Sequence, residues 1–337
     1  MEHEPSGQVG AAVPWGAAAT LGERMTALAS VIADGLDPAQ RRRALHPFAD
    51  EARRDWGYVP RARPGLPLRA MSEAQRKAVW ALVDEALSAE GAAKARGVLA
   101  LEAILQERAS DKAYRDPLNY ALALFGQPGQ GPWTWRFEGH HLSLTLTVVP
   151  GIGIAVTPHF LGANPFSGRV VGNDHAHGGL ARVLERESTL AFEVVNGLDA
   201  AALRQATIAA RSPADIVAGP GRELSLREPM GLRLDAMAAE QQHRVLALLE
   251  AFFGHLRREL AEAVMVKVRE AGIGSIRFAW AGATTPDQLH YYRLHGPTLI
   301  VEYDRTDSDH AHSVWHDPTN LFGEDHLHAH RRQAHGG

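Results

Sequence analysis

Histidine is the side chain that offers this protein the most chemistry. The sequence has 337 residues and 18 histidines, nine of which follow residue 289. It has no cysteine, which excludes disulfides, thiolate nucleophiles and cysteine-ligated zinc or iron–sulfur centres. A metal ion would therefore be bound by histidine, aspartate or glutamate, and imidazole nitrogen suits iron, copper and zinc.

The clearest candidate ligands are His310 and His312, in the string DSDHAHSVWHD (307–317). On an extended segment, residues two apart lie on one face with their Cα atoms about 6–7 Å apart, so both imidazoles can bind one ion. A third histidine or a carboxylate would complete an iron, copper or zinc site. The alternative is a surface loop rich in histidine and aspartate. The position of the pair after a hairpin that carries His290 favours the metal.

Two adjacent histidines, His140 and His141, lie within a period-two pattern that covers residues 133–148. On a strand, neighbours point to opposite faces, so His140 would group with Glu138 and Arg136, and His141 with the aromatic residues of the other face. Only one of the two would then enter a site, unless Gly139 forms a bulge. The alternative is a strand whose histidines form a polar rim.

A third cluster, HYYRLHGPTLIVEYD (290–304), has the pattern of a hairpin that turns at Gly296-Pro297. A two-residue turn places His290 on one face of the hairpin. Glu302 and Asp304 then lie on the other face, with Arg293. A three-residue connection would put His290 beside Glu302 instead, so the carboxylate partner of His290 stays open.

The C-terminal segment FGEDHLHAH (322–330) can form a short helix in which His326 and His330 share a face. A frayed terminus that binds metal adventitiously is the alternative. His175 and His177 repeat the His-x-His spacing inside a glycine-rich loop over 162–179, for which a mobile loop is the favoured interpretation.

Composition and motifs argue against several other classes of protein. The net charge is -4, and the longest basic run is Arg41–Arg43, so we expect no nucleic-acid partner. No stretch approaches the roughly 18 apolar residues of a membrane span, and the N-terminus lacks the features of a secretory signal. We expect a cytoplasmic protein, or a periplasmic or secreted one if a leader was removed. Nucleophile-elbow, phosphate-loop, dinucleotide-binding and His-Glu-x-x-His motifs are absent from the sequence.

The first third of the chain is predicted to be helical. A disordered arm is expected over residues 1–20, and helical spacing follows over 21–34 and 93–107. Ser72 can cap a further helix, because its hydroxyl accepts hydrogen bonds from free backbone amides. Residues 54–67, rich in proline and arginine, are expected to form an extended loop.

The remainder consists of runs of strands separated by runs of helices. Helical periodicity covers 180–195, 199–210 and 234–270, and strand patterns cover 133–148, 152–160, 275–281, 288–295 and 298–303. Such an order argues for α+β rather than a doubly wound sheet. We expect one α+β domain over 21–330, helical over 21–115 and β/α over 130–330. Its helical N-terminal part would pack on a mainly antiparallel β-sheet with long helices.

The strings that carry these histidines resemble a known family. WTWRFEGHHLSL (133–144), HYYRLHGPTLIVEYD (290–304), HAHSVWHDP (310–318) and FGEDHLHAH (322–330) are similar to DUF3500, an uncharacterised family, and the resemblance covers the chain from about Ala27. It implies no activity. Many relatives carry export leaders, which implies a periplasmic location as the alternative to a cytoplasmic one.

The resemblance also ranks the histidines and carboxylates. It sets aside His295, His316, His326 and His328, and the segment 304–310 departs from the family pattern at Arg305, Asp307 and Asp309. The residues that match the recurrent pattern are His140, His141, His290, Glu302, Asp304, His310, His312, Asp317 and His330.

These observations lead to one main hypothesis, a mononuclear metalloenzyme. His310 and His312 would bind the ion with one of His140 or His141, and His290 or a carboxylate would complete the shell. Iron- or copper-dependent oxygen chemistry on a small, anionic molecule is favoured, since such ions keep positions open for oxygen and substrate. The candidate metal ligands are His140, His141, His290, Asp304, His310, His312 and His330.

The candidate catalytic residues are Glu138, Arg136, Tyr291, Arg293 and Glu302. Arg136 and Arg293 would anchor the anionic substrate by bidentate hydrogen bonds. In a second hypothesis the metal is zinc, and Glu138, Glu302 or Asp304 is the general base of a hydrolase. A non-catalytic metal- or ligand-binding protein and a metal-free histidine pocket are further alternatives. The oligomeric state stays open.

Overall fold

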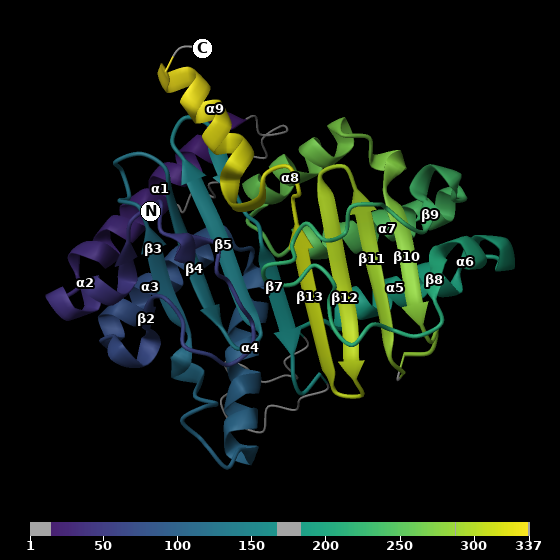
Figure 1. Cartoon of the computed structure of the whole chain (residues 1–337), viewed down its shortest axis with the longest axis horizontal. Helices are drawn as coiled ribbons and strands as arrows, with labels where there is room; N and C mark the ends of the chain where they lie inside the picture. Colours follow the sequence, from purple (N-terminus) through teal and green to yellow (C-terminus); the bar gives the residue numbers. More distant parts are fainter. Residues whose placement is uncertain (1–14, 167–182, 287, 336–337) are drawn as a thin grey trace, which may run out of the picture.

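The computed structural model describes residues 15–166, 183–286 and 288–335 (Figure 1). Its helices are α1 (Trp15–Asp34), α2 (Pro38–Ala44), α3 (Glu73–Ala86), α4 (Ala89–Arg108), α5 (Glu185–Asn196), α6 (Ala200–Ala206), α7 (Ala239–Phe253), α8 (Arg258–Glu270) and α9 (Glu324–His335). None of these helices is both long and apolar enough to cross a membrane.

The strands join in a single mixed sheet that is largely antiparallel, which confirms the α+β class. Their order is β1-β3-β4-β5-β7-β13-β12-β11-β10-β8, with β2, β6 and β9 attached to β3, β5 and β10. The strands are β1 (Leu45–His46), β2 (Leu66–Pro67), β3 (Ala121–Phe125), β4 (Trp133–Gly139), β5 (Leu142–Val149), β6 (Gly153–Ala155), β7 (His159–Ala163), β8 (Thr207–Ala209), β9 (Leu232–Arg233), β10 (Arg277–Gly282), β11 (His290–Gly296), β12 (Leu299–Asp307) and β13 (His310–His316).

The helical N-terminal part follows the sequence pattern closely. Ser72 caps α3 as expected, in a capping box with Gln75, whose side chain accepts from the Ser72 amide. α1 begins at Trp15, earlier than the predicted arm allows, and the rest of that arm lies outside the described residues. The glycine-rich loop with His175 and His177 also lies outside them.

The long helical stretch predicted over 234–270 is wrong in one respect, because it breaks into α7 and α8. Gly254 ends α7, and Leu256 forms a β-bridge with Leu87. Gly91 packs so closely on the carbonyl of His255 that a Cβ there would lie 2.0 Å from its oxygen. Tertiary contact with the start of α4 therefore breaks the helix. Likewise 199–210 is not one helix, because β-branched Thr207 and Ile208 begin β8, which pairs with β10.

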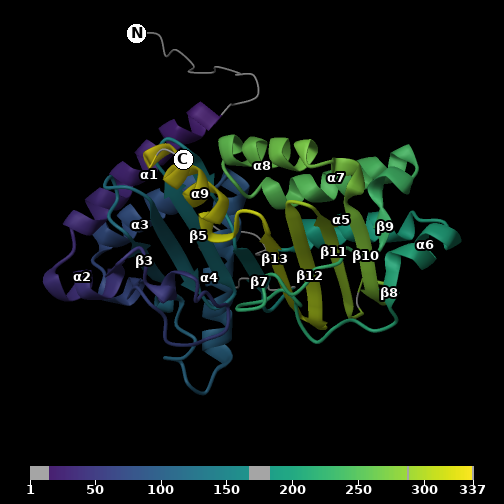
Figure 2. The same ribbon diagram turned by 45° about the horizontal axis from the view of Figure 1, so that its top comes forward.

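The two faces of the sheet are covered differently around β10–β13. Helices α5 and α7 lie behind these strands in the view of Figure 1. Figure 2 shows the same helices after a turn of 45° about the horizontal axis that brings the top of the molecule forward. On that face, the hydroxyl of Tyr292 donates to the Glu187 carbonyl. The stretch between β8 and β9 crosses the opposite face, where the Val217 amide donates to Glu302.

Non-helical segments therefore cover the second face and bury a small core of their own. It is separate from the main hydrophobic core, which lies between the sheet and the helices. Its buried members come from the loop before β2, from the segment 211–225, from the sheet itself and from the short 3-10 turn Leu321–Gly323 after β13: Trp56, Tyr58, Phe160, Ile216, Val314 and Phe322. The histidine cluster lies on this face.

Candidate metal centre

The turn between β4 and β5 consists of His140 and His141, which corrects their expected placement on a strand. β4 ends at Gly139, which pairs with Leu142, and His141 has a left-handed φ of 61°. Such a conformation is uncommon for a residue other than glycine. The two rings stack with their centroids 3.7 Å apart instead of pointing to opposite faces.

The backbone of His141 is held on both sides, which fixes the direction of its ring. Its amide donates to the Tyr58 carbonyl at 2.9 Å, and its carbonyl accepts from the Gly162 amide at 2.8 Å. Gly162 is required there, because a Cβ at this position would lie 2.8 Å from the imidazole. The ring therefore points toward the start of β13.

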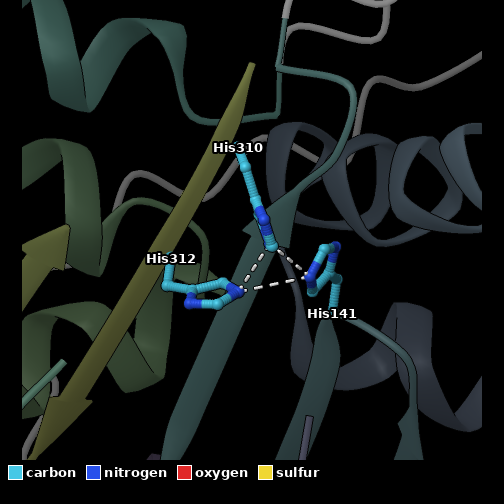
Figure 3. Close-up of side chains that lie close together, drawn as sticks. All are labelled: His141, His310 and His312. Carbon is cyan, nitrogen blue, oxygen red and sulfur yellow. Dashed lines mark hydrogen bonds between the residues drawn. The ribbon is translucent and has the colours of Figure 1, made fainter. Parts of the chain in front are cut away.

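His141, His310 and His312 converge on one point, and we call them the histidine trio (Figure 3). The Nε2 atom of His310 lies 2.9 Å from that of His312 and 2.9 Å from that of His141. The Nε2 atoms of His312 and His141 are 3.2 Å apart. Three nitrogens bound to one ion at about 2.0–2.1 Å, with angles of about 90–110° between them, would be separated by about 2.8–3.4 Å, so the trio has the spacing of a ligand set.

The tautomer of His312 determines whether its Nε2 atom can bind a metal ion. Its Nδ1 lies 2.7 Å from a carboxylate oxygen of Asp215 and donates a proton to it, which leaves the lone pair of Nε2 directed at the trio. Burial lowers the pKa of His141 and His310, with the neighbouring imidazoles contributing, and that of His310 falls to about 4. Neutral rings with converging lone pairs repel one another unless a cation or a shared proton lies between them.

Asp215 is the partner that the sequence did not reveal. It also accepts from the hydroxyl of Tyr58 at 2.7 Å, and the ring of Tyr58 lies edge-on to His312 with centroids 4.9 Å apart. Burial alone would raise the pKa of Asp215, but the hydrogen bond and charge of His312, together with the hydrogen bonds from Tyr58 and the Ile216 amide, lower that pKa below its ordinary value. Asp215 and His312 are 97 positions apart in the sequence, and no spacing signal links them.

Glu302, predicted to be catalytic, holds the segment that carries Asp215. It accepts from the amides of Val217 and Ala218 at 2.8 and 2.7 Å and from the hydroxyl of Tyr291 at 2.6 Å. His316, set aside in the sequence, donates from Nε2 to the Ala218 carbonyl at 2.7 Å. Glu302, Tyr291 and His316 thus position the segment from which Asp215 reaches His312.

The structure decides between the two hairpin registers that the sequence left open. Gly296 pairs with Leu299, so the two-residue turn is Pro297-Thr298, one residue later than expected. Moving the turn by one residue shifts each cross-strand pair by two positions, so every residue keeps its face of the sheet. Glu302 and Asp304 lie on the Arg293 face, and His290 lies on the other. Arg293 is buried beside Tyr291 and Glu302, where its positive charge lowers the pKa of both groups against the dominant effect of burial.

Asp304 pairs with His312 across β12 and β13 but is not a member of the trio. One carboxylate oxygen accepts from the Ser212 hydroxyl at 3.1 Å. Burial raises the pKa of Asp304 to about 8, and the nearby Asp215 and Glu302 carboxylates contribute. The group is therefore largely neutral at pH 7.

Glu138 and Arg136 hold the loop before β2 against the sheet. Glu138 accepts from the Gly57 amide at 2.9 Å, and Arg136 donates to the carbonyls of Ala52 and Arg53 at 3.0 and 3.2 Å. Both side chains are almost fully buried, and an ion pair of 3.3 Å joins them. They anchor the segment that brings Tyr58 to the trio.

The other predicted ligands lie apart from the trio. His140 stacks behind His141, and its Nδ1 is hydrogen-bonded to Glu102. His290 lies on the helix-covered face, stacked between Trp280 and Tyr303 at 5.3 and 5.5 Å. His330 is in α9, which follows the far end of β13 (Figure 1).

Fold and site together define a mixed α+β protein with a three-histidine centre on the loop-covered face of its sheet. The chain belongs to the family described as protein of unknown function DUF3500, which matches residues 18–324. No curated protein and no solved structure matches the chain. The match of the family model confirms the resemblance that the sequence strings indicated.

Proposed function

We propose that this protein is a mononuclear metalloenzyme in which His141, His310 and His312 bind one transition-metal ion. The observation that carries the proposal is the convergence of three Nε2 atoms within 3.2 Å, with the tautomer of His312 set by Asp215. Three ligands on one side of an ion leave its remaining positions for water, oxygen or substrate, which is typical of a catalytic centre.

Iron or copper oxidoreductase chemistry fits the surroundings better than zinc hydrolysis. A hydrolase needs a base that can reach the metal-bound water. Each carboxylate considered for that task has another partner: Glu138 and Glu302 accept from backbone amides, and Asp304 accepts from Ser212. When bound, iron or copper would supply the redox chemistry, and this chain would supply the imidazole ligands and a largely dry, aromatic surrounding.

Around the trio, the protein's own residues have defined tasks. Asp215 keeps His312 in the tautomer that ligates, and the phenol of Tyr58 shares that carboxylate. Tyr58 stacks on Phe160 with centroids 4.2 Å apart, which shields His312 from water. The substrate would reach the ion from the side of His310, the most exposed member of the trio.

The test is elemental analysis of the tag-free protein, expressed with iron, copper, manganese and zinc together and desalted over a mild chelator. We expect near-stoichiometric iron or copper, lost in His312→Ala and in His141→Ala. The control is His328→Ala, an exposed histidine of α9. Stoichiometric zinc would move the reaction class to hydrolysis, and oxygen-uptake measurements distinguish the two. No retained metal, or equal loss in the control, would contradict the proposal.

A further inference from the structure

A hollow of about 330 Å³ lies next to the trio on the side of His140. We call it the arginine hollow, after Arg43, Arg61 and Arg63 in its wall, which also includes Glu102, Tyr114 and His140. Its volume is at the lower end of the range of small-molecule sites, about 300–1,000 Å³. Because His140 stacks on His141 at 3.7 Å, an occupant of the hollow would lie one imidazole away from a proposed metal ligand.

The guanidinium groups of the hollow exceed the carboxylates that could neutralise them. Glu138 lies among three guanidiniums, with Arg136 at 3.3 Å, Arg63 at 3.5 Å and Arg61 at 3.9 Å. Asp55 pairs with Arg61 at 2.9 Å, which leaves one positive charge of these three in excess. Arg43 is exposed and has no ion-pair partner among the residues that the structure describes, which adds a second.

The two acidic residues of the wall do not cancel this excess. Glu102 is hydrogen-bonded to His140 and lies 3.9 Å from Arg115, which is not part of the wall. Asp116 pairs with Arg69 at 3.0 Å and caps the amide of Leu118 at 2.7 Å. Both carboxylates are thus already compensated, and the hollow keeps a positive charge.

We propose that the arginine hollow binds a small organic anion through its carboxylate or phosphate group. Arg43 and Arg61 would contact the head group, since guanidinium forks match both kinds of oxyanion. Tyr114 and the prolines of the wall offer apolar surface to the remainder of the molecule. The binding of this anion does not depend on the proposed function, because the rings of His140 and His141 lie between the hollow and the proposed ion. Arg136 and Arg293, expected to anchor the anion, are buried in the packing of the fold instead.

The test is isothermal titration calorimetry of the full-length, metal-loaded protein with benzoate, phenyl phosphate and uncharged benzyl alcohol. We expect saturable binding of the two anions only, weakened by about tenfold or more in Arg43→Gln. The matched control is Arg42→Gln, a neighbouring exposed arginine of α2 outside the hollow, which should change the dissociation constant by less than about twofold. The affinity ratio of benzoate to phenyl phosphate identifies the head group.

Several outcomes would overturn the proposal, and they differ from those that would overturn the metal centre. No anion binding up to about 10 mM, equal binding of benzyl alcohol, or equal losses in Arg42→Gln and Arg43→Gln would refute an anion site in this hollow. Anion binding that persists in metal-free His312→Ala supports the hollow whether or not the trio binds metal.

Discussion

Replacing Asp215 by asparagine removes one negative charge behind His312 and keeps the shape of the side chain. The carboxylate oxygen is 2.7 Å from Nδ1 of His312. Adding the ring and a metal–nitrogen bond of about 2 Å places the charge about 7 Å from a bound ion. Coulomb attraction between a single negative charge and a divalent cation at that distance is about 5 kcal/mol at an effective dielectric constant of about 20, and about 1 kcal/mol in water.

The measured effect should lie between these limits, because the side chain of Asp215 is 37% exposed. We expect a 10- to 100-fold weaker metal affinity, equivalent to about 1.4–2.8 kcal/mol, as is typical for the loss of an outer-shell carboxylate. The assay is competition with a chromophoric chelator, with a thermal melt of the metal-free protein to confirm folding.

Asp307 provides the matched control for this experiment. It faces Nδ1 of His310 at 3.6 Å, but its side chain is 63% exposed, so Asp307→Asn should change the affinity by less than about twofold. An unchanged affinity in Asp215→Asn, or an equal loss in both variants, would refute the argument that Asp215 prepares His312 for ligation.

Three further predictions concern the trio and the opposite face of the sheet. Gly162→Ala should fold but bind metal at least about tenfold more weakly, because the new Cβ would lie 2.8 Å from the ring of His141; an unchanged chelator titration would contradict this. Burial lowers the pKa of His159 to about 3. As the pH falls below about 6.5, this histidine is therefore protonated in the unfolded state before it is protonated in the folded state. The free energy of unfolding should drop by about 3 kcal/mol between pH 7 and pH 4 for this reason. Denaturant titrations should lack this part of the drop in His159→Gln, and an identical pH dependence would refute it. His330→Ala should keep the full metal content that His312→Ala loses, and metal loss in both would mean that α9 takes part in binding.

Much of the architecture could be read from periodicity, because local patterns report which side of an element is buried. The capping of α3 by Ser72 and the shared face of Glu302 and Asp304 depend on residues close in the sequence. The same patterns missed the break at Gly254, since a contact with Gly91 on another helix causes it.

For the candidate site, the sequence by itself determined the residue types and half of the geometry. The absence of cysteine restricts the donors to histidine and carboxylates, and the i, i+2 spacing on β13 puts His310 and His312 on adjacent positions of one face. These features are local, so no long-range contact was needed to predict them.

Only the tertiary structure decided which third histidine joins the pair and what supports it. The left-handed turn at His141 needs contacts with Tyr58 and Gly162, and Asp215 reaches His312 only because Glu302 holds its segment. Such contacts join residues far apart in the chain, and their geometry is fixed by packing rather than by any repeat in the sequence. The sequence could therefore not show that His290 and His330, which it ranked with the other histidines, lie away from the site.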